Sequence, residues 1–574
     1  MLVDTVPLDS ERSLAGGFSR RSWLLLAFVF AIIWFANLDV RKLQHPDEGR
    51  YAEIAREMVA TGDYVTPRLN GIKYFEKPPL QYWLTAASFR AFELDEWTAR
   101  LPSALSGFLT LVIVGYVGSV IASPVAGAYA AVALAGCVWP FGVAHMVTLD
   151  ALLTFWLTLA LGSFLLAQHQ GVSPGRRRAW ILLAWAATAG GMLTKGLVAL
   201  VIPFCTLVLH TLVTRDVAPW KRLHVVPGLL LFLALSAPWF IVVSSRNPDF
   251  ARFFFIHEHF ERFLTTEHRR TGAWWYFLPL LAVGLLPWTG FFLWDLRRSW
   301  RSASAQGTFA WVRFCLLWCA FVLVFFSASG SKLPSYILPI FPAAALVLGA
   351  ALERATVRTL GAFAAVTAAV AVILWSATVL AGQRIVLALS AGSTPAPLLD
   401  ALTPWIMLAL GVASVGNLAA WVAFRRNSER GKGAGIIALS LTMMLTMQVV
   451  YTASDLFRAT RSAFDLVTTL ENASNPPYDP SAPFFQVRMY DQTLPYYLRR
   501  TTTLVEYRDE LGPGLDAEPS LAIPREADWI ARWDSSTTQG YALMARDTFD
   551  ELKTAGVPMR VVASDFRRVL AARH

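Results

Sequence analysis

Residues 45–83 read HPDEGRYAEIAREMVATGDYVTPRLNGIKYFEKPPLQYW, and they follow directly on an apolar run at 23–38. Acidic and basic side chains are dense in this stretch, and Tyr and Trp lie among them. Most of the remaining chain is apolar, so a charged loop of this density requires a functional explanation. Charges mixed with aromatic rings just outside a bilayer suit a charged, partly lipidic substrate. The sequence therefore predicts that a loop at 39–98 forms much of an active site at a membrane surface.

Composition places the chain among membrane proteins. Hydrophobic residues make up 55% of it and charged residues 16%, and the mean hydropathy is +0.46. Soluble domains are normally about a quarter charged. The net charge of +10 would indicate nucleic acid in a soluble protein, but basic loops that face anionic lipid explain it better here. We therefore expect membrane lipids, and no nucleic acid, as partners.

Apolar runs of about 20 residues, the length that crosses hydrocarbon, recur along the chain and predict a mostly α-helical polytopic membrane protein with about thirteen spans. The spans are expected to begin near Arg21, Ala99, Ser123, Thr148, Ala179, Lys195, Leu223, Ala273, Thr308, Pro334, Leu360, Thr403 and Gly435. Alternate loops are short and simply basic, at 176–178, 221–222, 297–301, 354–358 and 425–432. The positive-inside rule places these loops in the cytoplasm, and hence loop 39–98 in the periplasm of a bacterial inner membrane.

The composition changes after residue 453, where apolar runs shorten and Pro, Asp and Arg become more frequent. We expect a transmembrane domain at 1–453 and a small periplasmic α/β domain at 454–574. The pattern predicts helices at 455–470 and 548–555 and strands at 484–489, 503–507 and 560–563. The chain has no Walker motif and no nucleotide-binding glycine pattern, so ATP-driven transport is not supported.

Two groups of candidate residues lie within the charged loop. Asp47 and Glu48, with Arg50 and Tyr51 beside them, can bind a cation, act as a base or orient a sugar hydroxyl or amine. The alternative is a solvated helix start that Asp47 caps. The second group is Glu76 and Lys77, flanked by Tyr74 and Tyr82 and followed by two prolines that restrict the backbone. Lys binds phosphate as a point charge, although a surface ion pair would contribute little.

Further candidates stand at the ends of predicted spans. Asp150 opens one span, and a carboxylate there can cap the helix or face inward, where ionisable groups are usually functional. Lys195 lies in a tight turn between two spans, and it can reach the interface or contact a lipid phosphate. Lys332 and Tyr336 precede another span, so Lys332 could anchor the helix end and Tyr336 could bond a phosphate.

A basic and histidine-rich segment completes the set. His257 and His259 form a His-x-His pair, and Arg262 follows. Such a pair can bind zinc but normally needs a third ligand, which Glu76 could supply if the two loops meet. A structural or pH-sensitive role is the alternative. Under the predicted topology all these groups lie on one side of the membrane, where several cations and a few carboxylates suit a phosphorylated lipid and the cleavage of a sugar–phosphate bond.

Four motifs together resemble the aminoarabinose transferases, in the protein-mannosyltransferase-like branch of the membrane glycosyltransferases with a C-type fold. They are Asp-Glu-x-Arg-Tyr-Ala-Glu-Ile at 47–54, Tyr-Phe-Glu-Lys-Pro at 74–78, Leu-Thr-Lys-Gly at 193–196 and Lys-Leu-Pro-Ser-Tyr-Ile-Leu-Pro at 332–339. The Asp-Glu motif is shared by the whole branch, whereas the Glu-Lys-Pro and Lys-Leu-Pro-Ser-Tyr motifs are more specific. The resemblance covers most of the membrane part and only weakly the tail.

The resemblance implies an inverting transferase that moves 4-amino-4-deoxy-L-arabinose from undecaprenyl phosphate to lipid A phosphates in the periplasm, which gives resistance to polymyxin. It implies Asp47 and Asp150 as essential carboxylates and a divalent metal, zinc, that Glu76 and His257 could share. We expect a monomer. The substrate-binding residues would be Glu48, Arg50, Tyr51, Tyr74, Lys77, Tyr82, Lys195, Arg262, Lys332 and Tyr336.

Two other functions compete with this interpretation. Another polyprenyl-phosphate sugar transferase of the same branch could act on protein or polysaccharide. A transporter or flippase for the lipid-linked sugar belongs to a different class, and transporters commonly place charges near the bilayer midplane between internal repeats. The charges here gather on one outer face and no repeat is visible, which favours the transferase.

Overall fold

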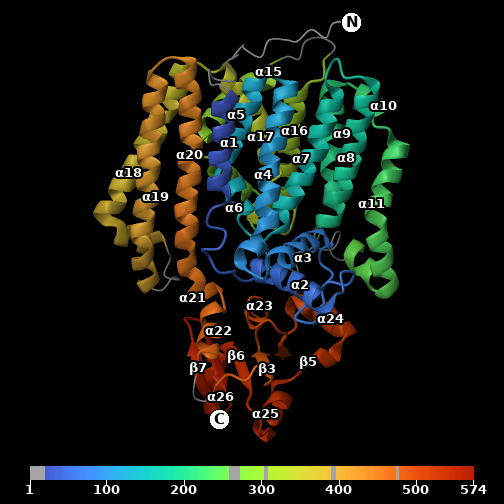
Figure 1. The fold of residues 1–574 in the computed structure, drawn as a ribbon, viewed down its shortest axis with the longest axis vertical. Helices are drawn as coiled ribbons and strands as arrows, with labels where there is room; N and C mark the ends of the chain where they lie inside the picture. The colour runs from blue at the N-terminus through green and yellow to red at the C-terminus, as the bar shows by residue number, and fades with distance from the viewer. Residues whose placement is uncertain (1–19, 257–271, 303–307, 390–395, 474–476, 574) are drawn as a thin grey trace.

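The structure is a computed structural model of the 574-residue chain, and it describes residues 20–256, 272–302, 308–389, 396–473 and 477–573. Three layers follow one another along the long axis of the molecule (Figure 1). A bundle of long helices forms the first layer, short helices of the loop at 39–98 form the second, and a domain that contains a β-sheet forms the third. The charged loop therefore lies between the bundle and the C-terminal domain.

Every apolar run predicted from the sequence corresponds to a helix or to a bent pair of helices. The bundle consists of α1 (Arg20–Phe35), α4 (Glu96–Ile121), α5 (Pro124–Ala135), α6 (Val138–Ala144), α7 (Leu149–Gln168), α8 (Pro174–Lys195), α9 (Val198–Thr214), α11 (Val225–Arg246), α14 (Phe277–Gly284), α15 (Thr289–Arg301), α16 (Trp311–Ala328), α17 (Ile340–Arg354), α18 (Val357–Leu389), α19 (Ala396–Arg425) and α20 (Glu429–Ser454). Within the described ranges, eight helices are long and apolar enough to span a membrane, and up to ten if each bent pair counts as one span. The chain is a multi-pass α-helical membrane protein, as predicted.

Two of the predicted spans are bent. The α5–α6 pair turns by 63° and the α14–α15 pair by 103°. The first bend follows Gly136, where a Cβ would lie 2.5 Å from the Cα of Ser440, so glycine allows α20 to approach closely. The second bend contains Pro287, which lacks the backbone N–H that would continue the helix.

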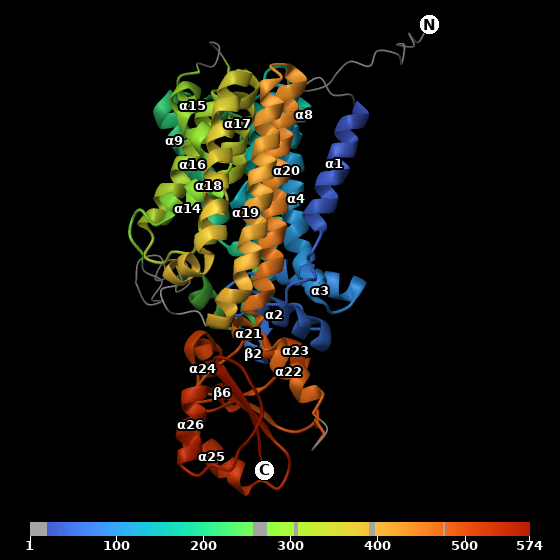
Figure 2. The same cartoon turned by 90° about the vertical axis from the view of Figure 1, so that its left-hand side faces the viewer.

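The second layer contains α2 (Asp47–Thr61), a short hairpin of β1 (Arg68–Leu69) and β2 (Ile72–Lys73), and α3 (Leu80–Phe92). Figures 1 and 2 show α2 and α3 across the end of the bundle. Helix α2 is followed by its C-cap, Gly62, which adopts a left-handed φ of 73°. Asp47 is the first helical residue and Pro46 is the N-cap, with no side-chain cap hydrogen bond. Helix capping therefore does not explain Asp47.

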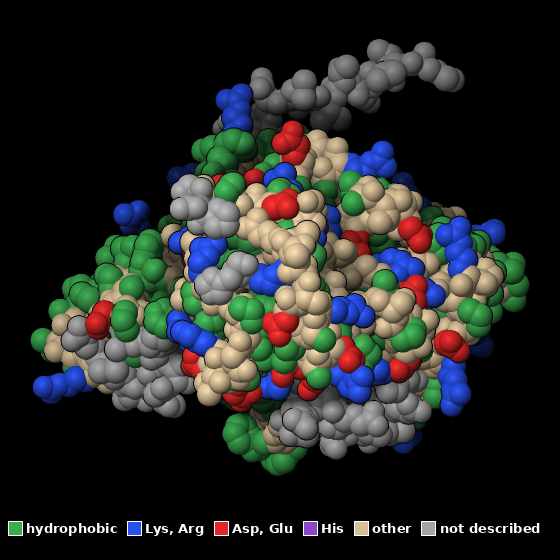
Figure 3. All heavy atoms as spheres, turned by 90° about the horizontal axis from the view of Figure 1, so that it is seen from below, with side chains coloured by type: hydrophobic (Ala, Val, Ile, Leu, Met, Phe, Trp, Pro, Cys, Tyr) green, Lys and Arg blue, Asp and Glu red, His purple; other side chains and the backbone are tan. Residues whose placement is uncertain are grey.

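The third layer is built on a six-stranded sheet of order β5-β4-β3-β6-β8-β7. Its strands are β3 (Phe484–Val487), β4 (Thr503–Val505), β5 (Ala522–Ile523), β6 (Tyr541–Ala545), β7 (Arg560–Ser564) and β8 (Arg568–Ala572). Strands β3 to β6 are parallel, and β8 pairs antiparallel with both β6 and β7. The helices are α22 (Phe464–Glu471), α23 (Leu494–Leu498), α24 (Gly512–Ala517), α25 (Glu526–Ser535) and α26 (Arg546–Thr554). Seen from below, the surface of the molecule carries both acidic and basic side chains (Figure 3).

The helix predicted at 455–470 is wrong as a single element. The structure divides it into η4 (Asp455–Phe457), α21 (Arg458–Arg461) and α22. The chain is extended at Ser462, with φ −135° and ψ 144°. At the next residue, the backbone N–H of Ala463 donates to Thr493 Oγ1 at 2.8 Å, so a contact from distant sequence replaces a helical hydrogen bond.

The C-terminal domain is fixed to the second layer by paired polar contacts. Arg68 donates to both carboxylate oxygens of Glu518, at 2.9 and 3.0 Å. Asn70 exchanges hydrogen bonds with the backbone of Thr502, at 2.8 and 2.7 Å. Gly49 on α2 faces the chain just before α23, where a Cβ would lie only 2.7 Å from a backbone carbon. The domain therefore packs directly against this face of α2.

Candidate functional site

Glu48 holds the start of α2 against the bundle. Its side chain is 1% exposed. Arg100 on α4 donates from Nε to Oε1 at 2.9 Å, and Arg41 donates from Nη2 to the same oxygen at 2.8 Å. The backbone N–H groups of Gln44 and Val147 donate to the carboxylate at 3.1 and 3.3 Å. Burial raises the pKa of Glu48, but the two guanidinium groups outweigh it and lower the pKa to about 2.

These contacts favour a structural role for Glu48, and its substrate-binding role stays a prediction. A buried carboxylate whose oxygens are already taken up by two cations and two N–H groups has no room for a ligand. Glu48 instead ties three segments together: α2, the start of α4 and the chain just before α7. We therefore propose that it is a positioning residue for its neighbour Asp47.

Asp47 and Arg50 form a second group on α2, and the C-terminal domain completes it. Arg50 Nη1 lies 2.6 Å from Asp47 Oδ1, and the other terminal nitrogen of Arg50 pairs with Glu510. Gln492 donates to Glu510 at 2.6 Å. Burial raises the pKa of Glu510, and the Arg50 charge opposes this. The side chain of Arg50 is 6% exposed whereas that of Asp47 is 37% exposed, so the Asp47 carboxylate is open to a ligand.

Three tyrosines lie in the same layer. The rings of Tyr51 and Tyr82 are 6.0 Å apart, and both side chains are buried. Burial raises the pKa of Tyr51 and of Tyr74 well above its ordinary value. The Tyr74 hydroxyl is buried and makes no hydrogen bond to any part of the chain that the structure describes. A neutral, unsatisfied hydroxyl of this kind can donate to a ligand oxygen.

Glu76 and Lys77 share a turn before α3. Lys77 Nζ lies 2.7 Å from the Glu76 carbonyl oxygen and 3.9 Å from its Oε2, and each side chain is 15% exposed. The neighbouring Phe75 contacts Phe250 edge-on at 5.2 Å between ring centroids. This apolar contact fixes the turn against the segment that follows α11.

Asp150 and Lys195 form an ion pair across two bundle helices. Asp150 is in the first turn of α7 and Lys195 is the last residue of α8. Lys195 Nζ also lies 4.7 Å from the ring centroid of Tyr336, which belongs to η3 (Pro334–Ile337). The side chains of Lys195 and Asp150 are 15% and 11% exposed. The segment just before α7 contacts Glu48 through Val147, so this pair and the α2 group share one end of the bundle.

Lys332 lies at a helix end, as one of its two expected roles requires. Its Nζ donates to the carbonyl oxygens of Ser327 and Ser329, at 3.1 and 2.7 Å, and the residue is 9% exposed. These carbonyls lie at the end of α16, where a cation stabilises the negative end of the helix dipole. The anchoring alternative therefore describes Lys332 better than substrate binding.

The predicted metal site and one predicted cation fall outside the described residues. His257 and Arg262 both lie in the segment 257–271, of which the structure describes nothing. Among the residues that are described, no group of three His, Cys, Asp or Glu side chains is placed to hold a metal ion. A metal on Glu76 and His257 stays a prediction.

Comparison with known proteins agrees with this architecture. Residues 21–301 match the dolichyl-phosphate-mannose-protein mannosyltransferase family, and residues 470–573 match the aminoarabinose transferase C-terminal domain. An undecaprenyl phosphate-alpha-4-amino-4-deoxy-L-arabinose arabinosyl transferase of Sodalis glossinidius is 32% identical over 418 residues, 72% of each chain. The chain belongs to the aminoarabinose transferase family. A homologue of the same name from Edwardsiella ictaluri is 34% identical over 338 residues, 58% of this chain and 60% of the relative.

The aminoarabinose transferase fold extends over almost the whole molecule. The crystal structure of ArnT from Cupriavidus metallidurans bound to undecaprenyl phosphate superposes with a TM-score of 0.89 and 36% identity, over 96% of this chain and 98% of that one. The apo structure gives a TM-score of 0.87. The family resemblance and the C-type membrane glycosyltransferase fold predicted from the motifs are therefore confirmed. The match includes the C-terminal domain, which the motifs covered only weakly.

The C-terminal domain also supplies a site residue that sequence reasoning missed. Glu510 reaches Arg50 from 460 residues away in the chain. It stands in an ordinary polar stretch with no motif around it, so only the fold brings it to α2. Two groups of predicted residues face each other across the end of the bundle. The second layer, which this domain covers, carries Asp47, Arg50, Tyr51, Tyr74, Glu76, Lys77 and Tyr82. The facing end of the bundle carries Asp150, Lys195 and Tyr336.

Proposed function

We propose that the chain is an inverting glycosyltransferase that moves 4-amino-4-deoxy-L-arabinose from undecaprenyl phosphate to a phosphate of lipid A. The observation that supports this most directly is the match to the ArnT structure over 98% of that chain, which includes both the bundle and the C-terminal domain. Carboxylates and cations from separate segments gather at the end of the bundle where these two parts meet. This arrangement suits a reaction between two lipid phosphates at a membrane surface.

In the proposed reaction, an oxygen of the lipid A phosphate attacks C1 of the sugar from the face opposite the leaving group. The bond between C1 and the donor phosphate oxygen breaks, and undecaprenyl phosphate departs with the electron pair. Negative charge grows on the leaving phosphate, and in this proposal Arg50 and Lys77 stabilise it while the Tyr74 hydroxyl donates a hydrogen bond to it. The acceptor phosphate is already anionic, so no strong base is required.

The carboxylates are then free for another task. The sugar carries an amino group, and Asp47 is accessible enough to hold it as an ammonium ion. Asp150 is paired with Lys195, and an arriving phosphate would compete for that lysine. We propose that Asp47 orients the donor sugar and that the Asp150–Lys195 pair positions the acceptor phosphate beside Tyr336.

We propose further that the C-terminal domain faces the periplasm across the inner membrane. The basic loops that follow α7, α9, α15, α17 and α19 all lie at the end of the bundle remote from this domain (Figure 1). Exposed tryptophans mark both ends of the α14–α15 region: Trp274 and Trp275 are 73% and 52% exposed, and Trp294 and Trp300 are 53% and 39% exposed. Tryptophans concentrate at the two membrane interfaces, and basic loops stay in the cytoplasm.

The proposal is tested by mass spectrometry of lipid A from cells with and without the gene. We expect lipid A to lose the added pentosamine mass when the gene is deleted and to regain it with the wild-type gene. Unchanged lipid A would contradict the proposal and would favour a related transferase that acts on protein or polysaccharide. Transfer by the purified protein between added donor and acceptor, without an ion gradient, would exclude a flippase.

The possible zinc ion needs a separate test. The proposal is that Glu76 and His257 share it, and the purified protein can be analysed for bound metal after dialysis. We expect about one equivalent in the wild type and a loss in the Glu76→Gln variant, because zinc sites lose affinity when a ligand is removed. Metal-free protein with full transfer activity would show that the reaction needs no such ion.

A further inference from the structure

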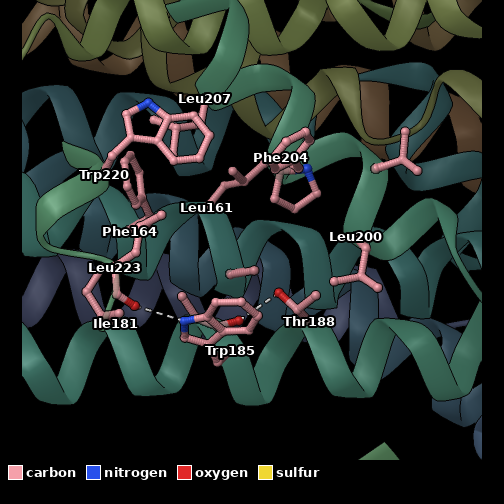
Figure 4. A pocket seen from close by; sticks show the side chains of 14 residues that line it. Leu161, Phe164, Ile181, Trp185, Thr188, Leu200, Phe204, Leu207, Trp220 and Leu223 are labelled. Atoms are coloured by element: carbon pink, nitrogen blue, oxygen red, sulfur yellow. Dashed lines mark hydrogen bonds between the residues drawn. The ribbon is translucent and has the colours of Figure 1, made fainter. Parts of the chain in front are cut away.

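An apolar pocket of about 360 Å³ lies in the bundle between α7, α8, α9 and the short helix α10 (Ala218–Lys221). Its walls include Leu161, Phe164, Phe204 and Leu207 (Figure 4). The lining side chains are aliphatic or aromatic apart from Thr188, whose hydroxyl donates to a backbone carbonyl of its own helix at 2.8 Å. The lining runs from Leu200 near the start of α9 to Trp220 on α10, and none of the residues of the proposed transfer site belongs to it.

The walls of this pocket are held in place by specific contacts. Trp185 donates from Nε1 to the carbonyl oxygen of Leu223 at 3.0 Å (Figure 4). On its outer side, Gly228 of α11 leaves room for the indole, because a Cβ there would lie 2.1 Å from Nε1. Trp220 donates from Nε1 to Thr211 Oγ1 at 2.8 Å. Two indoles that are bonded in this way cannot turn inward to fill the space, so the pocket is pre-formed.

The pocket reaches the outer surface of the bundle, and basic residues stand next to its lining residues in the sequence. Phe204, at its edge, is 58% exposed on the outer surface of the bundle. Lys221 and Arg222 follow directly after the lining residue Trp220, and Arg178 lies one helical turn before the lining residue at position 181. Arg178 and Lys221 are both exposed. Arg222 is oriented by a 3.0 Å hydrogen bond to Gln168 Oε1.

We propose that this pocket binds an acyl chain of an anionic glycerophospholipid whose phosphate contacts Arg178, Lys221 and Arg222. Apolar cavities stay dry and take apolar ligands instead, and the volume falls within the range of about 300–1,000 Å³ that is usual for small-molecule sites. Exposed cations at one mouth of an apolar pocket match a molecule with an anionic head and a hydrocarbon tail. The bound lipid would brace α8 against α9, and this role does not depend on the transfer reaction.

The experiment is native mass spectrometry of the full-length protein, released from detergent after addition of phosphatidylglycerol or phosphatidylcholine. We expect the wild type to retain phosphatidylglycerol in preference to phosphatidylcholine. Neutralising Lys221 or Arg178 (Lys221→Gln, Arg178→Gln) should weaken phosphatidylglycerol binding about fivefold each, since one cation near an anionic lipid surface contributes about that factor. Arg426→Gln, at the same end of the bundle but on α19–α20, is the matched control and should bind as the wild type does.

A second pair of variants tests the pocket itself. Ala184 lines the pocket, whereas Ala186 on the same helix does not. Ala184→Phe should fill the space and abolish retention of phosphatidylglycerol, and Ala186→Phe should leave it unchanged. Equal retention of both lipids, or retention that survives Ala184→Phe, would overturn the proposal. Displacement of the lipid by low concentrations of undecaprenyl phosphate would also overturn it, because the pocket would then hold the polyprenyl chain.

Discussion

Neutralising Glu48 should destabilise the protein far more than neutralising the adjacent Asp47. Glu48 is the only carboxylate, among the described residues, that both Arg41 and Arg100 contact. In Glu48→Gln the two buried guanidinium groups face an amide instead. The pKa of Glu48 falls from 4.5 to about 2 in the folded protein, and at 1.36 kcal/mol per pKa unit the ionised carboxylate contributes about 3 kcal/mol. Removal of one partner of a buried ion pair typically costs about 3–5 kcal/mol, which agrees with the value from the pKa shift.

The measurement is the free energy of unfolding in detergent micelles, from denaturant titration followed by tryptophan fluorescence at pH 7. Glu48→Gln should lose about 3 kcal/mol, and addition of Arg100→Met should restore part of it, because one unpaired cation is removed. Asp47→Asn, whose carboxylate is 37% exposed, should unfold like the wild type but lose transfer. A Glu48→Gln protein as stable as the wild type, or an equal loss in Asp47→Asn, would refute the reasoning.

The same carboxylate determines one pH dependence. Since its folded pKa lies below the unfolded value, its contribution is complete above pH 4.5 and is lost as the pH falls through about 2. The loss of stability between these values should be smaller in Glu48→Gln than in the wild type.

Three further predictions concern Glu57 and Gly49 on α2 and the Asp150–Lys195 pair. Burial raises the pKa of Glu57 from 4.5 to about 8, so between these values the folded protein holds a proton that the unfolded chain has lost. Its stability should therefore fall as the pH rises through this window. Glu57→Gln should remove this fall, as denaturant titration at pH 5 and pH 9 would show. Gly49→Ala should cost about 1–3 kcal/mol and reduce transfer, because its Cβ would meet backbone at 2.7 Å; a variant with unchanged stability would contradict the close approach. Asp150→Asn should abolish transfer and Lys195→Met should raise the KM for lipid A, measured with purified protein; unaltered kinetics in both would show that the pair has no part in the reaction.

The bundle could be predicted from the sequence because hydrophobic length is a local property. Each apolar run became a helix or a bent pair, and even the bend after α14 has a local sign in Pro287. Strands β6 and β8 were missed because they are buried on both faces, so YALMA and RVLAA show no alternation of polar and apolar residues. Their apolar character is explained only by the sheet in which they lie.

The candidate site could be predicted only where its residues are close together in the sequence. Asp47, Arg50, Glu76 and Lys77 are close in sequence, so composition alone marked them. The sequence could not separate Glu48 from Asp47, because the difference between them is made by Arg100, 52 residues further along the chain. The pairing of Asp150 with Lys195 spans 45 residues and follows from the packing of α7 against α8.

Assembly of the site depends on the position of β8 in the sheet. This strand lies inside the sheet between β6 and β7, and its first residue, Arg568, is buried against Asp491 and donates to the Ser462 carbonyl at 2.7 Å. The same sheet carries the segment that presents Glu510 to Arg50. A nascent chain can therefore insert all its helices and still lack a finished reaction centre. Assembly of the site would therefore wait for β8 to pair with β6 and β7.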